Sequence, residues 1–416
     1  MSDFDFVLYN GAVKIIVLGA GASGLFYSLF AASHGHEVLI LESNEKAGKK
    51  MYITGKGRCN LTNDSSVKEC ISNVVRNPKF LYSCFSKWNA EDTIAFFNDH
   101  GCPVKTERGN RVFPESDKSS DAINCLLREC KKSGVEILFH QKAKSVKKVG
   151  NHFLIETENR TFESDALVIA TGGKSYPQTG STGDGYSFAK SFGHQIVYPV
   201  AALCPIKIKE NPNRGMLELT LKNVSLTAEN ASFKKTLFGD MEFLPNRITG
   251  PISLSMSSLI NRIGKVDLHL DFKPALDEQT LDARILREIK AQPNKDVRYL
   301  LSRMLPMDIL DFFLEKCDVA EDLPLNSLSK DGRKQILHLL KQFPLSFDGL
   351  DSIEKGIVTS GGVSVDEINA KNLESKRVPG LYFIGEVLDV DAFTGGFNMQ
   401  IAFSTAYAAA DSLPYE

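Results

Sequence analysis

Residues 14–42, KIIVLGAGASGLFYSLFAASHGHEVLILE, decide the fold of this chain. The stretch begins with residues 15–18, a short apolar run rich in β-branched side chains, which is typical of a buried parallel strand. An alanine-rich apolar segment follows and predicts a helix that ends near Gly35. Residues 38–41 form a second apolar run, which ends at Glu42. The pattern predicts a strand–helix–strand unit of the Rossmann type.

Three glycines at GxGxxG spacing, Gly19, Gly21 and Gly24, join the first strand to the helix. The first glycine permits a tight turn, the second lets a pyrophosphate approach the backbone, and the third lets the helix lie close to the strand. The helix N-terminus offers free N–H groups and a positive dipole end to the phosphates. Glu42 is placed to accept hydrogen bonds from a ribose diol, and its charge disfavours a 2′-phosphate. The unit therefore predicts a site for FAD or NAD.

Composition limits the classes of protein to which the chain can belong. The 416 residues are 43% hydrophobic and 24% charged, which is typical of a globular protein with two or three domains. The net charge of −2 predicts neither a nucleic-acid partner nor a membrane partner. The N-terminus lacks the features of a secretory signal, so we expect a cytoplasmic protein. The eight cysteines form no CxxC pair and no zinc-like cluster, so we expect no metal and no redox disulfide.

Glycine-rich segments recur far from the fingerprint. Residues 43–63 are rich in glycine, lysine and small polar side chains, and predict an irregular loop laid along a polar ligand. Residues 171–173 follow a buried-strand pattern at residues 166–170. Gly395 and Gly396 open an apolar helix, whose amides could stabilise the negative charge of a reduced flavin. One fingerprint with two further glycine loops favours one long ligand, FAD, over a nicotinamide cofactor.

The middle of the chain has a different composition. Near Val197 the pattern changes to alternating β-type segments with proline and asparagine turns, which extend over residues 199–272. Residues 276–345 carry amphipathic, charged helical patterns. The sequence thus predicts a β domain and then a helical domain, inserted between two parts of the nucleotide-binding domain.

Long motifs in this sequence resemble the YhiN/BaiN-like family of bacterial three-domain flavoproteins. The resemblance covers residues 14–205 and 356–411 and lies in GAGASGL (19–25), GKKMYITGKGRCNLTN (48–63), ATGGKSYPQTGSTGDGY (170–186), LESKRVPGLYFIGEVLDVD (373–391) and TGGFNMQIAFS (394–404). It implies an α/β fold in which a Rossmann-like FAD-binding domain of the two-dinucleotide-binding type is interrupted by a β-barrel-like domain and a helical domain. The expected boundaries are 1–197 and 351–416 for the FAD-binding domain, 198–274 for the β insert and 275–350 for the helical insert.

The resemblance also implies which residues bind the cofactor. Those expected at the pyrophosphate and the adenosine are Gly19, Ala20, Gly21, Ala22, Ser23, Gly24, Glu42, Ala143, Thr171 and Gly172. Those expected along the ribityl chain and flavin are Lys50, Thr54, Gly55, Arg58, Cys59, Asn60 and Thr62. Those expected to close over the flavin end are Gly385, Glu386, Asp389, Gly395, Gly396, Phe397, Asn398 and Met399.

Three features depart from the family pattern. Ala392 stands where the family usually has glycine, and Phe397 stands where it usually has tyrosine, so a hydroxyl near the ring is lost. Residues 244–251 read LPNRITGP, whereas the family often has THFGxSGP. If this segment contacts substrate, the pocket differs from that of the relatives.

The sequence leaves three functions open. The first is an FAD-dependent oxidoreductase that transfers a hydride between flavin N5 and a small organic substrate of the amine, ketone or enone class, with NAD(P)H or oxygen as its redox partner. The second is a flavin-dependent RNA-modifying enzyme, which the near-neutral charge does not favour. The third is a non-enzymatic flavin sensor. No His/Asp base with suitable spacing is present, so we assign no catalytic acid or base.

Overall fold

The computed structural model describes residues 11–212 and 215–413. The chain forms two compact units, Met1–Ala201 with Ile353–Glu416 and, between them in sequence, Ala202–Ser352. Most of the N-terminal segment considered for a secretory signal lies outside the described residues.

A parallel five-stranded sheet organises the first unit. Its strands lie in the order β21-β11-β1-β2-β7. Their bounds are β1 Lys14–Leu18, β2 Glu37–Leu41, β7 Glu136–Leu138, β11 Ala166–Ile169 and β21 Leu381–Phe383. In the central strand, Ile16 pairs with Leu167 on one side and Leu39 on the other. The carboxyl ends of these strands face one edge, where doubly wound sheets bind ligands.

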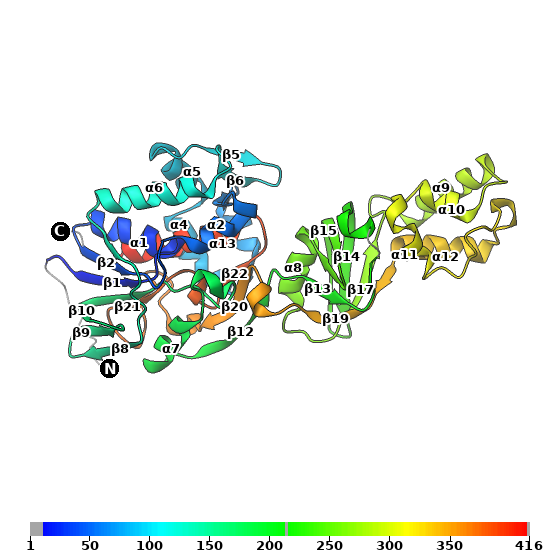
Figure 1. Ribbon diagram of the computed structural model, residues 1–416. Helices are drawn as coiled ribbons and strands as arrows, with labels where there is room; N and C mark the ends of the chain where they lie inside the picture. Colours follow the sequence, from blue (N-terminus) through cyan, green and yellow to red (C-terminus); the bar gives the residue numbers. More distant parts are fainter. Residues whose placement is uncertain (1–10, 213–214, 414–416) are drawn as a thin grey trace. The chain divides into compact units, whose positions relative to one another are not determined.

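Helices cover one face of this sheet and a small antiparallel sheet covers the other (Figure 1). The helices are α1 Ala22–Ser33, α6 Ser119–Lys132 and α13 Phe397–Ala410. The antiparallel strands are β8 Ser145–Val149, β9 His152–Glu156 and β10 Thr161–Ser164. Helix α1 is buried on most sides, and Phe26 on it packs edge-on against Trp88 and Phe96. The predicted Rossmann-type fold is confirmed.

The prediction of an irregular segment at residues 43–63 is wrong in part. The segment contains helix α2 (Lys49–Ile53) and strand β3 (Thr62–Asn63). Helix α2 starts behind Gly48, which has φ +68°, and Met51 anchors it in the core at 2% exposure. One buried methionine among lysines and glycines leaves no apolar period in the sequence, which is why the helix was missed.

Shorter elements complete the first unit. They are α3 Val67–Ser72, β4 Val74–Arg76, α4 Tyr82–Lys87, α5 Ala90–Asp99, β5 Val104–Glu107, β6 Arg111–Pro114, α7 Asp184–Ser191, β12 Ile196–Ala202, β20 Val358–Val363 and β22 Asp391–Ala392. The 3-10 helix η9 (Gly385–Val387) follows β21. Asn89 caps α5 by accepting the N–H of Asp92.

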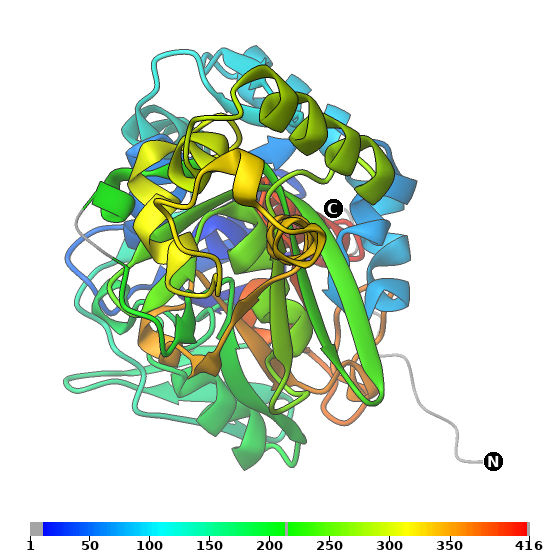
Figure 2. The same cartoon turned by 90° about the vertical axis from the view of Figure 1, so that its right-hand side faces the viewer.

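The second unit contains a seven-stranded antiparallel sheet, in which the long β14–β15 hairpin is prominent (Figure 2). The strands are β13 Ile206–Ile208, β14 Thr220–Asn230, β15 Phe233–Leu244, β16 Arg247–Thr249, β17 Asp267–Asp271, β18 Phe343–Leu345 and β19 Phe347–Leu350. Strands β18 and β19 lie at opposite edges of the sheet but are joined by Ser346 alone. The sheet must therefore curve until its edges meet, as in a barrel.

Helices pack against this sheet in one hydrophobic core. They are α8 Pro251–Ile260, α9 Glu278–Ala291, α10 Val297–Ser302, α11 Leu310–Leu314 and α12 Lys330–Lys341. Phe312 on α11 contacts both Phe243 on β15 and Phe343 on β18, with ring centroids 5.5 Å and 5.4 Å apart. The separation of a β insert from a helical insert at residue 274 stays a prediction. The unusual segment 244–251 forms the β15–β16 turn and the start of α8.

Candidate functional site

The three fingerprint glycines lie at the carboxyl end of β1 and differ in their surroundings. Gly19 has φ +105°, and its N–H donates to the Leu41 carbonyl at 2.9 Å. A Cβ on Gly24 would lie 2.0 Å from the Gly19 oxygen, so only glycine lets α1 approach the turn this closely. At Gly21 a Cβ would meet no other atom within 4 Å. The open space beside Gly21 is where the fingerprint predicts a pyrophosphate.

The start of α1 is suited to an anion. Gly21 is its N-cap residue, no side chain caps it, and its first turn contains no acidic residue. The amides of the first turn therefore keep their capacity to bind a negatively charged group.

Glu42, at the end of β2, braces the glycine turn. Its Oε2 accepts the Ala20 N–H at 2.7 Å, and its Oε1 accepts the N–H and Nδ2 of Asn44 at 2.8 and 2.7 Å. Ser43 also donates to Oε1. Oε1 accepts three of these hydrogen bonds and Oε2 accepts one. Oε2 can therefore still accept a hydrogen bond from a ribose hydroxyl.

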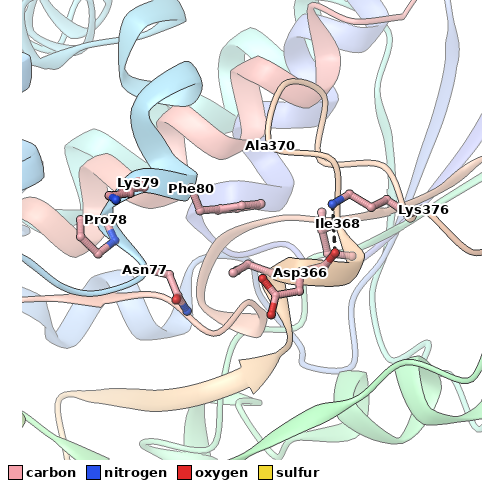
Figure 3. A pocket seen from close by; sticks show the side chains of 9 residues that line it. Asn77, Pro78, Lys79, Phe80, Asp366, Ile368, Ala370 and Lys376 are labelled. Carbon is pink, nitrogen blue, oxygen red and sulfur yellow. Dashed lines mark hydrogen bonds between the residues drawn. The ribbon is translucent and has the colours of Figure 1, made fainter.

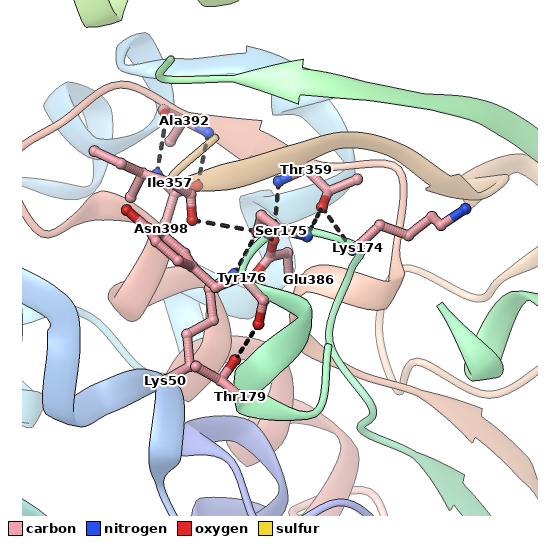
Figure 4. A network of polar contacts seen from close by, with 10 residues as sticks. All are labelled: Lys50, Lys174, Ser175, Tyr176, Thr179, Ile357, Thr359, Glu386, Ala392 and Asn398. Carbon is pink, nitrogen blue, oxygen red and sulfur yellow. Dashed lines mark hydrogen bonds and ion pairs between the residues drawn. The ribbon is translucent and has the colours of Figure 1, made fainter. Parts of the chain in front are cut away.

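A polar network lies farther along the same sheet edge (Figure 4). Lys50 on α2 donates to Ser175 Oγ at 2.6 Å and pairs with Glu386 Oε2 at 2.7 Å. Glu386, on η9, also accepts the Ser175 hydroxyl at 3.0 Å and the Thr359 N–H at 2.9 Å through Oε1. Residues from α2, β20, η9 and the segment after β11 thus meet on one carboxylate.

Residues 173–183 run between the two polar clusters. Asn44, which binds Glu42, also donates to the Thr179 carbonyl at 3.1 Å. At the other end, a Cβ on Gly173 would lie 2.4 Å from Thr359 Oγ1, so this segment packs tightly beside Glu386. The Thr171 hydroxyl that precedes it is buried and has no hydrogen-bond partner among the described residues. Residues 173–183 therefore connect the surroundings of Glu42 with those of Glu386.

The second glycine pair contacts the predicted loop near residue 60. Gly396 has φ +103° and is the N-cap residue of α13; a Cβ there would lie 2.3 Å from the Thr62 carbonyl oxygen. Asn63 donates to the Gly395 carbonyl at 2.8 Å. With its amide turned to satisfy its neighbours, Asn60 accepts the Gly396 N–H at 3.0 Å. The fold therefore brings together two segments more than 330 residues apart in sequence.

Several predicted site residues use their side chains within the protein. Arg58 pairs with Glu107 at 2.8 Å and Asp117 at 3.2 Å. Thr62 donates to Gln400 at 2.6 Å. The Asn398 side chain accepts the backbone N–H of Ala392 and donates to the Ala392 carbonyl. The other members lie along the same segments: Ala22 and Ser23 on α1, Thr54, Gly55 and Cys59 after α2, Ala143 before β8, Gly172 after β11, Gly385 on η9, and Phe397 and Met399 on α13.

Asp389 has partners that sequence reasoning missed. Its side chain is 4% exposed, and Arg76 binds both of its oxygens at 2.6 and 2.7 Å. Asn77 donates to its carboxylate and to its carbonyl. Arg76 and Asn77 stand in no recognisable local pattern, because Asp389 is 313 residues from the first and 312 from the second. Asn77 also lines a pocket of about 550 Å³ with Pro78, Lys79, Phe80, Val365, Asp366, Ile368, Ala370 and Lys376 (Figure 3).

The cysteines are unsuited to thiolate chemistry. Burial raises the pKa of all eight thiols, that of Cys59 to about 12. Cys317 alone among them is half-buried rather than buried. We expect Ellman's reagent at pH 8 to label at most one thiol rapidly in the native protein and all eight in denaturant. Rapid labelling that survives Cys317→Ser would contradict this assignment.

His194 forms a buried chain of contacts with Glu367 and Ser375. Its Nδ1 lies 3.2 Å from Glu367 Oε2, and its Nε2 lies 2.9 Å from Ser375 Oγ. Ser375 Oγ also accepts hydrogen bonds from the backbone N–H groups of Arg377 and Val378. Because Ser375 is only 6% exposed, we assign its hydroxyl a structural role rather than contact with substrate.

Burial lowers the pKa of His194, against the opposing effect of Glu367. As pH falls below about 6.5, the unfolded chain takes up this proton before the native chain does, so stability should fall. We expect the melting temperature to drop between pH 7.5 and 5.5, and to drop less in His194→Gln. The exposed His140→Gln variant is the control and should behave as wild type. An equal drop in His194→Gln would assign the effect to other groups.

Two further properties concern residues 11–212 and 215–413. In this part of the chain no three His, Cys, Asp or Glu side chains gather in a way that could hold a metal ion. No helix there combines the length and the apolar character needed to cross a membrane.

Comparison with known proteins adds a family and several relatives. The model of the HI0933-like protein Rossmann domain matches residues 13–412. The chain is 30% identical to the ribosomal RNA dihydrouridine synthase of Escherichia coli K12, over 96% of this chain and 97% of that protein. It is 29% identical to the protein of that name from Haemophilus influenzae, over 96% and 98%. It is 28% identical to the 3-dehydro-bile acid delta(4,6)-reductase of Clostridium scindens, over 95% and 98%.

Solved structures show the same fold at low identity. One is the open conformation of a flavocytochrome c3 fumarate reductase, with TM-score 0.51, 16% identity, and coverage of 97% of this chain and 78% of that one. Another is the 3-ketosteroid-delta4-(5alpha)-dehydrogenase of Rhodococcus jostii RHA1, with TM-score 0.51, 12% identity, and coverage of 98% and 99%.

Proposed function

We propose that this chain, which belongs to the HI0933-like family, binds FAD non-covalently and is an oxidoreductase acting on a small organic substrate. The substrate carries a carbon–carbon double bond conjugated to a carbonyl, the enone class. The observation that carries the proposal is the open space at Gly21 beside the uncapped start of α1, with Glu42 at the end of the neighbouring strand.

Each part of the sheet edge has a role in holding this cofactor. The glycine turn and α1 would hold the pyrophosphate, and Glu42 would hold the adenosine ribose. Lys50 and Glu386, which pair with each other at 2.7 Å, would offer a cation and an acceptor to hydroxyl and phosphate oxygens of the ribityl arm. The start of α13, at Gly395 and Gly396, would present its N-terminal dipole to the flavin end.

When bound, FAD supplies hydride transfer at N5, and the chain binds and orients the substrate. The Clostridium scindens relative is named a delta(4,6)-reductase of a 3-dehydro bile acid. The two dihydrouridine synthases are named for a product in which the double bond of uridine beside a carbonyl is saturated. Both names describe hydrogen addition to a double bond next to a carbonyl, which supports the enone class over amines.

A second candidate is the same chemistry on uridine within RNA. The names of two relatives that match nearly the whole chain favour it. The net charge of −2 does not, because non-specific RNA binding needs a basic surface.

One set of spectra tests both candidates. The purified protein should show oxidised-flavin bands near about 370 and about 450 nm, which NADH or NADPH should bleach anaerobically. Addition of 4-androstene-3,17-dione, an enone probe, should restore the 450 nm band. Restoration by a ribosomal RNA transcript alone would favour the second candidate, and bleaching by amines would favour an amine oxidase. A protein made with ample riboflavin that shows no flavin bands would contradict FAD binding.

A further inference from the structure

The hydroxyl of Tyr186 is buried and has no hydrogen-bond partner among the described residues. Tyr186 lies on α7 and is 6% exposed. The Thr171 hydroxyl, in the segment after β11, is also buried without a partner among these residues. Buried hydroxyls are nearly always hydrogen-bonded, because an unpaired one is destabilising. Two of them on adjacent elements point to a missing common partner.

Tight packing brings the start of α7, next to Tyr186, against the Thr171 hydroxyl. A Cβ on Gly185 would lie 2.2 Å from Thr171 Oγ1 and 3.1 Å from Val387 Cγ2. The start of α7 is therefore pressed against the end of β11 and against η9, the 3-10 helix that carries Glu386. Gly385, which opens η9, abuts α1, since a Cβ there would lie 2.6 Å from Ser23 Oγ. Tyr186 thus belongs to the same cluster of elements as the glycine turn.

Neither Glu386 nor Asp389 accepts a hydrogen bond from the Tyr186 hydroxyl. Glu386 accepts from Lys50, Ser175 and Thr359, and Asp389 is bound by Arg76 and Asn77. Burial, and then the charges of these two carboxylates, raise the pKa of Tyr186. The phenol is thus a neutral donor at neutral pH, and the described chain provides no acceptor for it.

We infer that the Tyr186 hydroxyl, together with that of Thr171, is a ligand of the bound cofactor and donates to an oxygen of its ribityl–phosphate arm. The inference rests on the proposed function, since it needs FAD in this cradle. It adds Tyr186, the last residue of the motif at residues 170–186, to the residues expected to bind the cofactor.

Tyr186→Phe separates a cofactor ligand from a structural tyrosine. The variant should bind FAD about tenfold more weakly, measured by quenching of flavin fluorescence when FAD is titrated into the stripped protein. Its melting temperature without FAD should be unchanged or higher, because a buried unpaired hydroxyl is removed. A purely structural role would move the melting temperature and leave FAD affinity alone. Thr171→Val is a second variant and should also lose several-fold in affinity.

Tyr27→Phe is the matched control. Tyr27, on α1, is fully buried, and its hydroxyl also lacks a partner among the described residues. This variant should bind FAD as wild type does. Affinity within twofold of wild type for Tyr186→Phe, or equal losses in Tyr27→Phe and Tyr186→Phe, would overturn the inference. If the wild-type protein itself fails to bind FAD, the proposed function fails instead.

Discussion

Gly21→Ala is expected to weaken FAD binding by at least about 100-fold while the protein stays folded. The new methyl group would enter the space where the pyrophosphate must approach the backbone. It meets no protein atom within 4 Å, and Gly21 has φ −82°, which alanine adopts without strain. Titration of the stripped variant with FAD measures the first effect. Thermal unfolding without FAD should show no change.

Gly24→Ala is the matched control, three residues along the same turn. Its methyl group would lie 2.0 Å from the Gly19 oxygen, so the helix or the turn must move. We expect the free energy of unfolding to fall by about 3 kcal/mol or more, at the upper end of overpacking effects. FAD binding would then be lost because the native fold is destabilised, and not because the methyl group blocks the cofactor. Wild-type affinity in Gly21→Ala would show that the open space at Gly21 is not the pyrophosphate site.

Arg76→Ala is expected to lower the free energy of unfolding by about 3–5 kcal/mol, because it leaves the buried Asp389 carboxylate without its cation. The Asp389 side chain is 4% exposed and that of Arg76 is 27% exposed, so water only partly replaces the lost guanidinium. Urea unfolding without FAD measures the change. The bond also holds the segment before α13 in place, so FAD affinity should fall as well.

Two variants delimit this effect. Arg298→Ala removes an arginine whose side chain is 38% exposed and whose partners, Asp311 and Glu321, are both exposed. It should lower the free energy of unfolding by at most about 1 kcal/mol. Combining Arg76→Ala with Asp389→Asn removes the buried charge and should recover part of the loss. A loss below about 1 kcal/mol in Arg76→Ala would mean that water solvates Asp389 well in the native state.

Regular elements of the Rossmann unit could be predicted because their causes are local. The apolar runs of β1 and β2, the glycines between them and the Asn89 cap of α5 act within a few residues. Helix α2 was missed because a single buried methionine, Met51, fixes it in the core. The curvature of the second unit's sheet was implied by family resemblance, and the structure gives its cause in the Ser346 connection.

The candidate site divides in the same way. The sequence by itself determined the Rossmann unit and the glycine turn, since spacing between neighbouring residues carries that information. Tertiary structure alone decided that Lys50 meets Glu386, that Arg76 holds Asp389, and that Arg58 pairs with Glu107. The first two pairs join residues more than 300 positions apart. A charge leaves no periodic pattern in sequence, so its partner is known only when packing has brought the two together.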